Sequence, residues 1–123
     1  MQRTAMMAVL SAALVTGANT SFANETMSEM QCIEVIIAVS KLEMATAGMA
    51  PLDEALADVK AIQPTIPADV GPPVDNLISI AKSAQEIEIG DPTHPMATGD
   101  SQEASLSYQK ALAPYCPDYN LED

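Results

Sequence analysis

Six residues between positions 86 and 100 form the densest group of side chains that could do chemistry. They combine carboxylates, one imidazole and one thioether: Glu86, Glu88, Asp91, His94, Met96 and Asp100. Carboxylate and imidazole ligands suit a divalent cation, although this spacing fits no established metal-binding loop. We therefore weigh two interpretations: an exported protein that binds a metal or small ligand through residues 86–100, and a solvent-exposed loop in which His94 is hydrated.

The methionines offer a second ligand type. Thioethers suit Cu(I), and the chain has five candidates: Met27, Met30, Met44, Met49 and Met96. Methionine also fills irregular gaps in cores that lack aromatic side chains. Because Met30 and Met44 lie among the apolar residues of a predicted helix, we expect them to pack in the core, and we predict no cofactor.

Residue types that favour catalysis are scarce. His94 is the only histidine, and the chain has no serine nucleophile elbow, glycine-rich phosphate loop or zinc motif. Acidic pairs such as Asp53 with Glu54 could act in glycoside hydrolysis, but a small helical domain without an aromatic sugar platform argues against it. We predict that the protein is not an enzyme.

The first 23 residues have the pattern of a secretion signal. Arg3 precedes a mostly apolar stretch from Ala5 to Val15, which is shorter than the roughly 20 residues that span a bilayer. Ser21, Phe22 and Ala23 suit a signal peptidase. We predict a cleaved signal peptide at 1–23, a single domain at 24–123, and a periplasmic or secreted protein. An uncleaved anchor or a core helix is the alternative for the apolar stretch.

The predicted mature chain is strongly acidic. All 17 Asp and Glu residues follow Ala23 and Arg3 leaves with the signal, so four lysines face 17 carboxylates, a balance of −13. Nucleic acids and anionic membranes reward clustered Lys and Arg, so we expect neither as a partner. Cationic partners, divalent metals and proton uptake in acid stay open, as does the simpler role of keeping a secreted protein soluble.

Apolar periodicity and proline positions predict four helices in the mature chain, at about 27–47, 51–63, 73–89 and 101–113. Capping boxes are expected at Thr26 with Glu29 and at Asp100 with Glu103. The prolines make 64–72 an extended connector and 91–99 a loop, and the tail from Pro117 is expected to fray.

The first of these helices stands out because apolar residues cover far more than one stripe of it. Such a helix is expected to be central or pressed against a partner. Frequent β-branched residues leave a strand over 33–39 as the runner-up. Gly48 is the expected stop signal.

The only two cysteines, Cys32 and Cys116, should pair in an exported protein. In an antiparallel four-helix bundle, the start of the first helix and the end of the fourth lie at the same end, and the two cysteines occupy those places. The predicted fold is therefore an all-α, antiparallel four-helix bundle closed by one disulfide. A redox role is the alternative, although redox pairs usually sit two residues apart.

Several short segments resemble one known family. They are MQCIEVI at residues 30–36, Gly48, EALADVKAI at 54–62 and PADV at 67–70. Together they resemble the periplasmic acid-stress chaperones of the HdeA/HdeB type over about residues 30–70. That family has its second cysteine soon after the segment that resembles 67–70, whereas here it is Cys116.

The resemblance implies a stress-response function: ATP-independent binding of unfolded client proteins through apolar helix surface exposed at low pH. The implied client-binding residues are apolar positions on the first two helices: Ile33, Ile36, Ile37, Leu56 and Val59. The plainer interpretation of each is a core residue. Other folded proteins, or a second copy of the chain in a homodimer, are further candidate partners.

Overall fold

The computed structural model describes residues 27–119, so the predicted signal peptide at 1–23 lies outside it. Within the described range every regular element is helical and no strand forms, which rules out a strand over 33–39. The described residues form five α-helices where four were predicted: α2 (Glu29–Thr46), α3 (Leu52–Ile62), α4 (Gly71–Ala84), α5 (Pro95–Thr98) and α6 (Asp100–Leu112). Between positions 27 and 119, three single turns of 3-10 helix cover Gln63–Thr65, Ala113–Tyr115 and Pro117–Tyr119.

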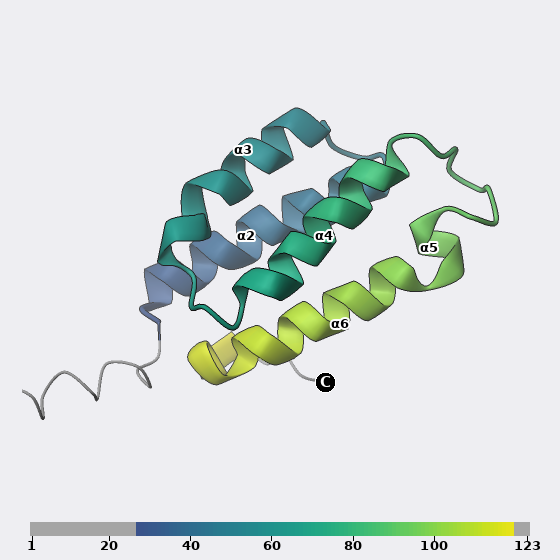
Figure 1. The fold of residues 1–123 in the computed structure, drawn as a ribbon. Helices are drawn as coiled ribbons and strands as arrows, with labels where there is room; N and C mark the ends of the chain where they lie inside the picture. The colour runs from purple at the N-terminus through teal and green to yellow at the C-terminus, as the bar shows by residue number, and fades with distance from the viewer. Residues whose placement is uncertain (1–26, 120–123) are drawn as a thin grey trace, which may run out of the picture.

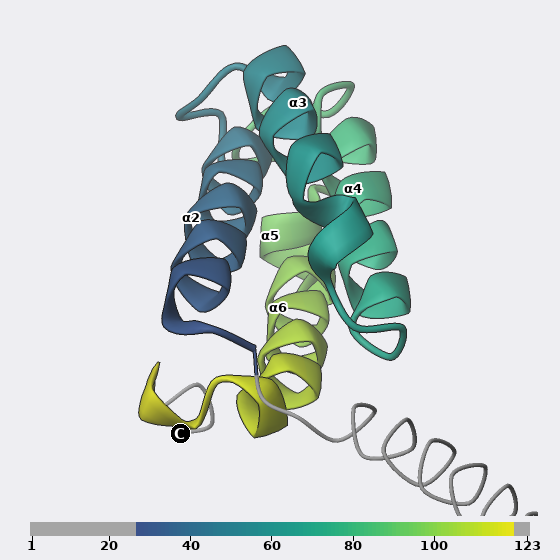
Figure 2. The same cartoon turned by 90° about the vertical axis from the view of Figure 1, so that its left-hand side faces the viewer.

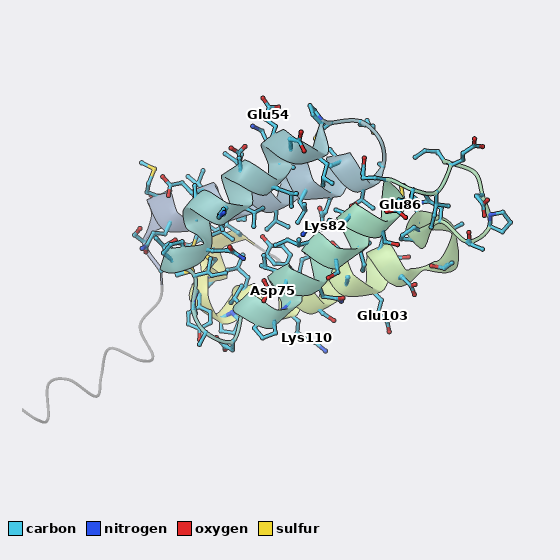
Figure 3. The ribbon with its side chains drawn as sticks, turned by 45° about the horizontal axis from the view of Figure 1, so that its top comes forward. Glu54, Asp75, Lys82, Glu86, Glu103 and Lys110 are labelled. Carbon is cyan, nitrogen blue, oxygen red and sulfur yellow. A yellow bond between two sulfur atoms is a disulfide. The ribbon has the colours of Figure 1, made fainter. Side chains whose placement is uncertain are left out.

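The four longer helices surround one core (Figures 1 and 2). Helix α2 packs against both α3 and α4, and α4 packs against α6, while the short α5 lies against the start of α6. Outward-facing positions carry charge, as Glu54 on α3 and Lys110 on α6 illustrate (Figure 3). The core consists mainly of small and medium aliphatic side chains, among them Val35, Val39, Leu42, Ala55, Val59, Val74, Leu77, Ala81 and Leu112.

Helix α2 begins at a capping box two residues after the predicted one. The Gln31 backbone N–H donates to Ser28 Oγ at 3.1 Å, and the Ser28 N–H donates to Gln31 Oε1 at 2.9 Å. The predicted box with Glu29 is therefore wrong, because Glu29 is the first helical residue and not the third. Thr26, its predicted partner, lies outside the described residues. The helix ends at Thr46, and Gly48 follows with a φ of 78°, as expected of a stop glycine.

Helix α4 begins earlier and ends earlier than the predicted range of 73–89. Pro72 and Pro73 lie in its first turn, where their missing N–H groups cost no helical hydrogen bond. After Ala84, the side-chain amide of Gln85 donates to the carbonyls of Ala81 and Ala45, both at 3.1 Å. This contact with α2 accompanies the end of α4, and turns replace the predicted last helical residues.

The segments between the long helices contain more regular secondary structure than predicted. A 3-10 turn interrupts the expected extended connector at 64–72, and α5 forms inside the expected loop at 91–99. Helix α6 starts at Asp100 after Gly99, whose φ is 93°, with no side-chain cap, so the second predicted capping box is wrong. In the tail that was predicted to fray, Tyr119 packs against the core, and residues 120–123 lie outside the described range.

A disulfide joins Cys32, in the first turn of α2, to Cys116, which follows α6. Their Cα atoms lie 6.0 Å apart, and both residues are buried. Beside this bond, the Met27 N–H donates to the Tyr115 carbonyl at 3.1 Å. The predicted pairing is confirmed, and the two ends of the described chain meet at this place.

Among the buried core residues of the described chain, one has an aromatic side chain. Tyr108 of α6 is buried, and its hydroxyl has no hydrogen-bond partner. Burial, together with the nearby Glu43 carboxylate, raises the pKa of Tyr108. Both effects disfavour the ionised phenolate in the folded protein.

Loss of the disulfide should reduce stability strongly. The bond closes a loop across a sequence separation of 84 residues, for which the chain-entropy model gives roughly 4–5 kcal/mol. We expect the Cys32→Ala/Cys116→Ala variant to lose several kcal/mol of unfolding free energy in urea denaturation. A loss below about 1 kcal/mol would show that the bond does not limit the unfolded chain in this way.

Removal of the unpartnered hydroxyl should stabilise the core. We expect Tyr108→Phe to raise the unfolding free energy by about 1 kcal/mol at neutral pH, since a buried unpaired hydroxyl costs about that much. Because burial holds the pKa of Tyr108 above its value in the unfolded chain, the folded protein loses stability as the pH rises above 10. The variant lacks this hydroxyl and should therefore lose less stability in alkali.

Urea denaturation at neutral pH and above pH 10 measures both effects. Tyr115→Phe is the matched control, because its hydroxyl donates to Asp69 Oδ1 at 2.8 Å. That variant should become slightly less stable at neutral pH. Equal losses in the two variants would contradict the assignment of an unpaired hydroxyl to Tyr108.

Candidate functional site

His94 is buried, contrary to the expectation of a hydrated loop histidine. Its side chain is 2% exposed. Its Nδ1 atom accepts a hydrogen bond from the Met96 N–H at 3.2 Å and so caps the short helix α5, while Nε2 is buried without a partner. The imidazole is therefore a structural cap of α5 and is not open to solvent.

The carboxylates of the same segment do not gather around His94. Glu86, Glu88, Asp91 and Asp100 are exposed, and no group of three or more acidic, histidine or cysteine side chains within residues 27–119 could hold a metal ion. The Asp91 carboxylate accepts hydrogen bonds from the Thr93 N–H and hydroxyl, at 2.9 and 2.7 Å, which lower the pKa of Asp91. The described segment forms a turn and does not assemble the predicted metal site.

The methionines within residues 27–119 are mostly on the surface. Met30 and Met44, expected in the core, are exposed, as are Met49 and Met96. In this part of the chain, only Met27 is partly buried against the core. The prediction that Met30 and Met44 fill core gaps is therefore wrong.

Two of these methionines belong to an apolar stripe on α2, which we call the α2 outer face. It consists of Met30, Ile33, Ile37 and Met44, which are 65%, 37%, 55% and 43% exposed. Steps of three, four and seven residues place them on one side of the helix. The buried residues of α2, such as Val35 and Leu42, lie on the other side.

The five predicted client-binding residues divide between this face and the interior. Ile33 and Ile37 are exposed on the α2 outer face. Ile36 and Leu56 are partly buried against the core, and Val59 is fully buried. The structure thus leaves two of the five accessible to a partner, and it adds Met30 and Met44, which the sequence interpretation assigned to the core.

A groove runs between α2 and α3 beside Ile37, and we call it the α2–α3 groove. Its hollow has a volume of about 390 Å³, and its lining combines four apolar residues with two carboxylates: Ile37, Ala38, Ala61, Ile62, Glu34 and Asp58. The groove and the α2 outer face meet at Ile37, which belongs to both.

One ion pair lies at this groove. The Lys41 Nζ atom donates to Asp58 Oδ2 at 2.7 Å, and both side chains are partly exposed. The hydrogen bond and the charge of Asp58 raise the pKa of Lys41, and Glu54 adds to this effect. Lys41 is therefore positively charged at neutral pH, and Asp58 already neutralises it.

Comparisons with family models, curated proteins and solved structures give no match for this chain. The resemblance to the HdeA/HdeB-type chaperones therefore stays a prediction. None of the helices within residues 27–119 is long and apolar enough to cross a membrane. The functional interpretation rests on the α2 outer face and the α2–α3 groove.

The exposure difference between two predicted client-binding residues gives a direct test of this geometry. We expect Ile37→Ser to change the unfolding free energy by less than about 0.5 kcal/mol, because the side chain is largely in solvent. Val59→Ala should lower it by about 2 kcal/mol, because it leaves a cavity in the core. Urea denaturation compares them, and equal losses would place Ile37 in the core.

Proposed function

We propose that this protein is an exported, ATP-independent protein-binding module of chaperone-like character, in which the α2 outer face binds apolar segments of other polypeptides. In this proposal residues 1–23 direct export, and residues 24–123 form an antiparallel four-helix bundle in the periplasm or outside the cell. The observation that carries the proposal is the row of four large apolar side chains exposed on α2. Contiguous apolar surface of this kind marks interaction sites on soluble proteins.

The residue types of the face suit adaptable binding. Met30 and Met44 are unbranched and flexible, and methionine is over-used at surfaces that accept many partners. Further burial of four partly exposed side chains would yield a few kcal/mol, about 1 kcal/mol for each, before the cost of association. Binding of this strength fits transient capture of clients better than a permanent complex.

Acid would strengthen the binding of apolar segments by reducing the overall negative charge of the chain. Ordinary Asp and Glu side chains take up protons near pH 4, and the predicted mature chain has 17 of them. Because the α2 outer face is exposed without such a change, some binding is expected at neutral pH.

Suppression of client aggregation tests the proposal. We expect the mature chain, residues 24–123, to slow the aggregation of an unfolded client at pH 7 and to slow it more at about pH 3. The Ile33→Ser/Ile37→Ser variant should lose at least half of this effect, because it removes the centre of the apolar face.

The matched control is Leu106→Ser/Ile89→Ser, which replaces two exposed apolar residues outside α2. It should retain the activity of the unmodified chain. No suppression at either pH, or equal losses in both double variants, would overturn the assignment of client binding to the α2 outer face.

A further inference from the structure

The charge around the α2–α3 groove is unbalanced. Glu34 and Asp58 line the groove, and Glu54 is close enough to act on Lys41. Lys41 is the one amine in this group, and it already pairs with Asp58. Three carboxylates against one ammonium leave an excess of two negative charges beside an apolar surface.

Small residues give the groove room. Ala38 of α2 and Ala61 of α3 face the hollow, and Ile37 and Ile62 complete its apolar lining. A large apolar side chain of a partner fits where two alanines leave space between packed helices. An amphipathic helix is the common occupant of such grooves, because its apolar residues recur on one side.

A second copy of this chain is a poor occupant on charge grounds. It would bring the same acidic residues to the interface, and each chain has a formal net charge of −12. Like charges placed across an interface suppress association. The charge of the groove is complementary to a basic partner instead.

We propose that the α2–α3 groove and the adjoining α2 outer face bind an amphipathic helix of another protein whose apolar side is bordered by lysine or arginine. The apolar side of that helix would cover Ile37 and fill the hollow beside Ala38 and Ala61. Its basic side chains would approach Glu34, Asp58 and Glu54. This inference rests on the proposed protein-binding function and names the chemistry of the partner.

Designed peptides test the charge requirement. Three helical peptides of 18 residues, the length of α2, would share one leucine-rich apolar side and differ only in its borders, which are lysine, glutamine or glutamate. Calorimetric titration into the mature chain at pH 7 should give the lysine peptide about tenfold tighter binding than the glutamine peptide. The glutamate peptide should bind most weakly, and added salt should reduce the differences.

Two charge variants locate the effect. Glu34→Gln/Asp58→Asn should weaken binding of the lysine peptide to nearly the level of the glutamine peptide, while binding of the glutamine peptide stays unchanged. Glu86→Gln/Glu103→Gln removes the same amount of charge from exposed positions after α4 and on α6 (Figure 3). That control should retain the tenfold preference, and equal effects of both variants would overturn the assignment to the groove.

The remaining outcomes separate this inference from the proposed function. Equal binding of all three peptides, abolished by Ile33→Ser/Ile37→Ser, would overturn the charge requirement but support a protein-binding face. No binding of any peptide would overturn both. Sedimentation of the mature chain alone should give a monomer, and a dimer that Ile37→Ser dissociates would show that a second copy covers the face instead.

Discussion

The bond between Cys32 and Cys116 fixes the start of α2 to the chain that follows α6. The core between these ends consists mainly of valine, alanine and leucine, with one buried tyrosine. Small aliphatic side chains bury little surface each, so a core of this size stabilises a domain only modestly. The covalent closure limits the unfolded chain and compensates for this weakness. It also holds α2 in place while one side of that helix stays uncovered.

Helix α2 connects stability to the candidate function. One side packs on α3 and α4 and supplies much of the core, and the opposite side exposes Met30, Ile33, Ile37 and Met44. A helix that is apolar on all sides is normally enclosed. Here the bundle does not enclose it, and the cost of exposed apolar surface is the physical reason to expect a partner.

The sequence predicted the helical class and the approximate positions of the long helices, because prolines and apolar periodicity act locally. It predicted the cysteine pair because no other cysteine competes for either partner. Prediction from the sequence failed where contacts between residues far apart in the chain determine the structure. The end of α4 involves a hydrogen bond from Gln85 to Ala45 of another helix, and His94 is buried although it lies in a predicted loop, directly before the short helix α5. Helix α2 has apolar residues on both sides, so no local signal distinguishes its buried side from its exposed side, and Met30 and Met44 were placed wrongly. The α2–α3 groove could not be predicted, because it forms only when the two helices pack together.

The position of the cysteines also sets an order of events. Cys32 is made 84 residues before its partner, and the sequence holds no other cysteine with which it could pair. No shorter nascent chain can therefore close the native bond, whatever helices it has formed. Once an external oxidant joins Cys32 to Cys116, all the helices from α2 to α6 must already have been synthesised. A chain interrupted before Cys116 therefore lacks this covalent constraint.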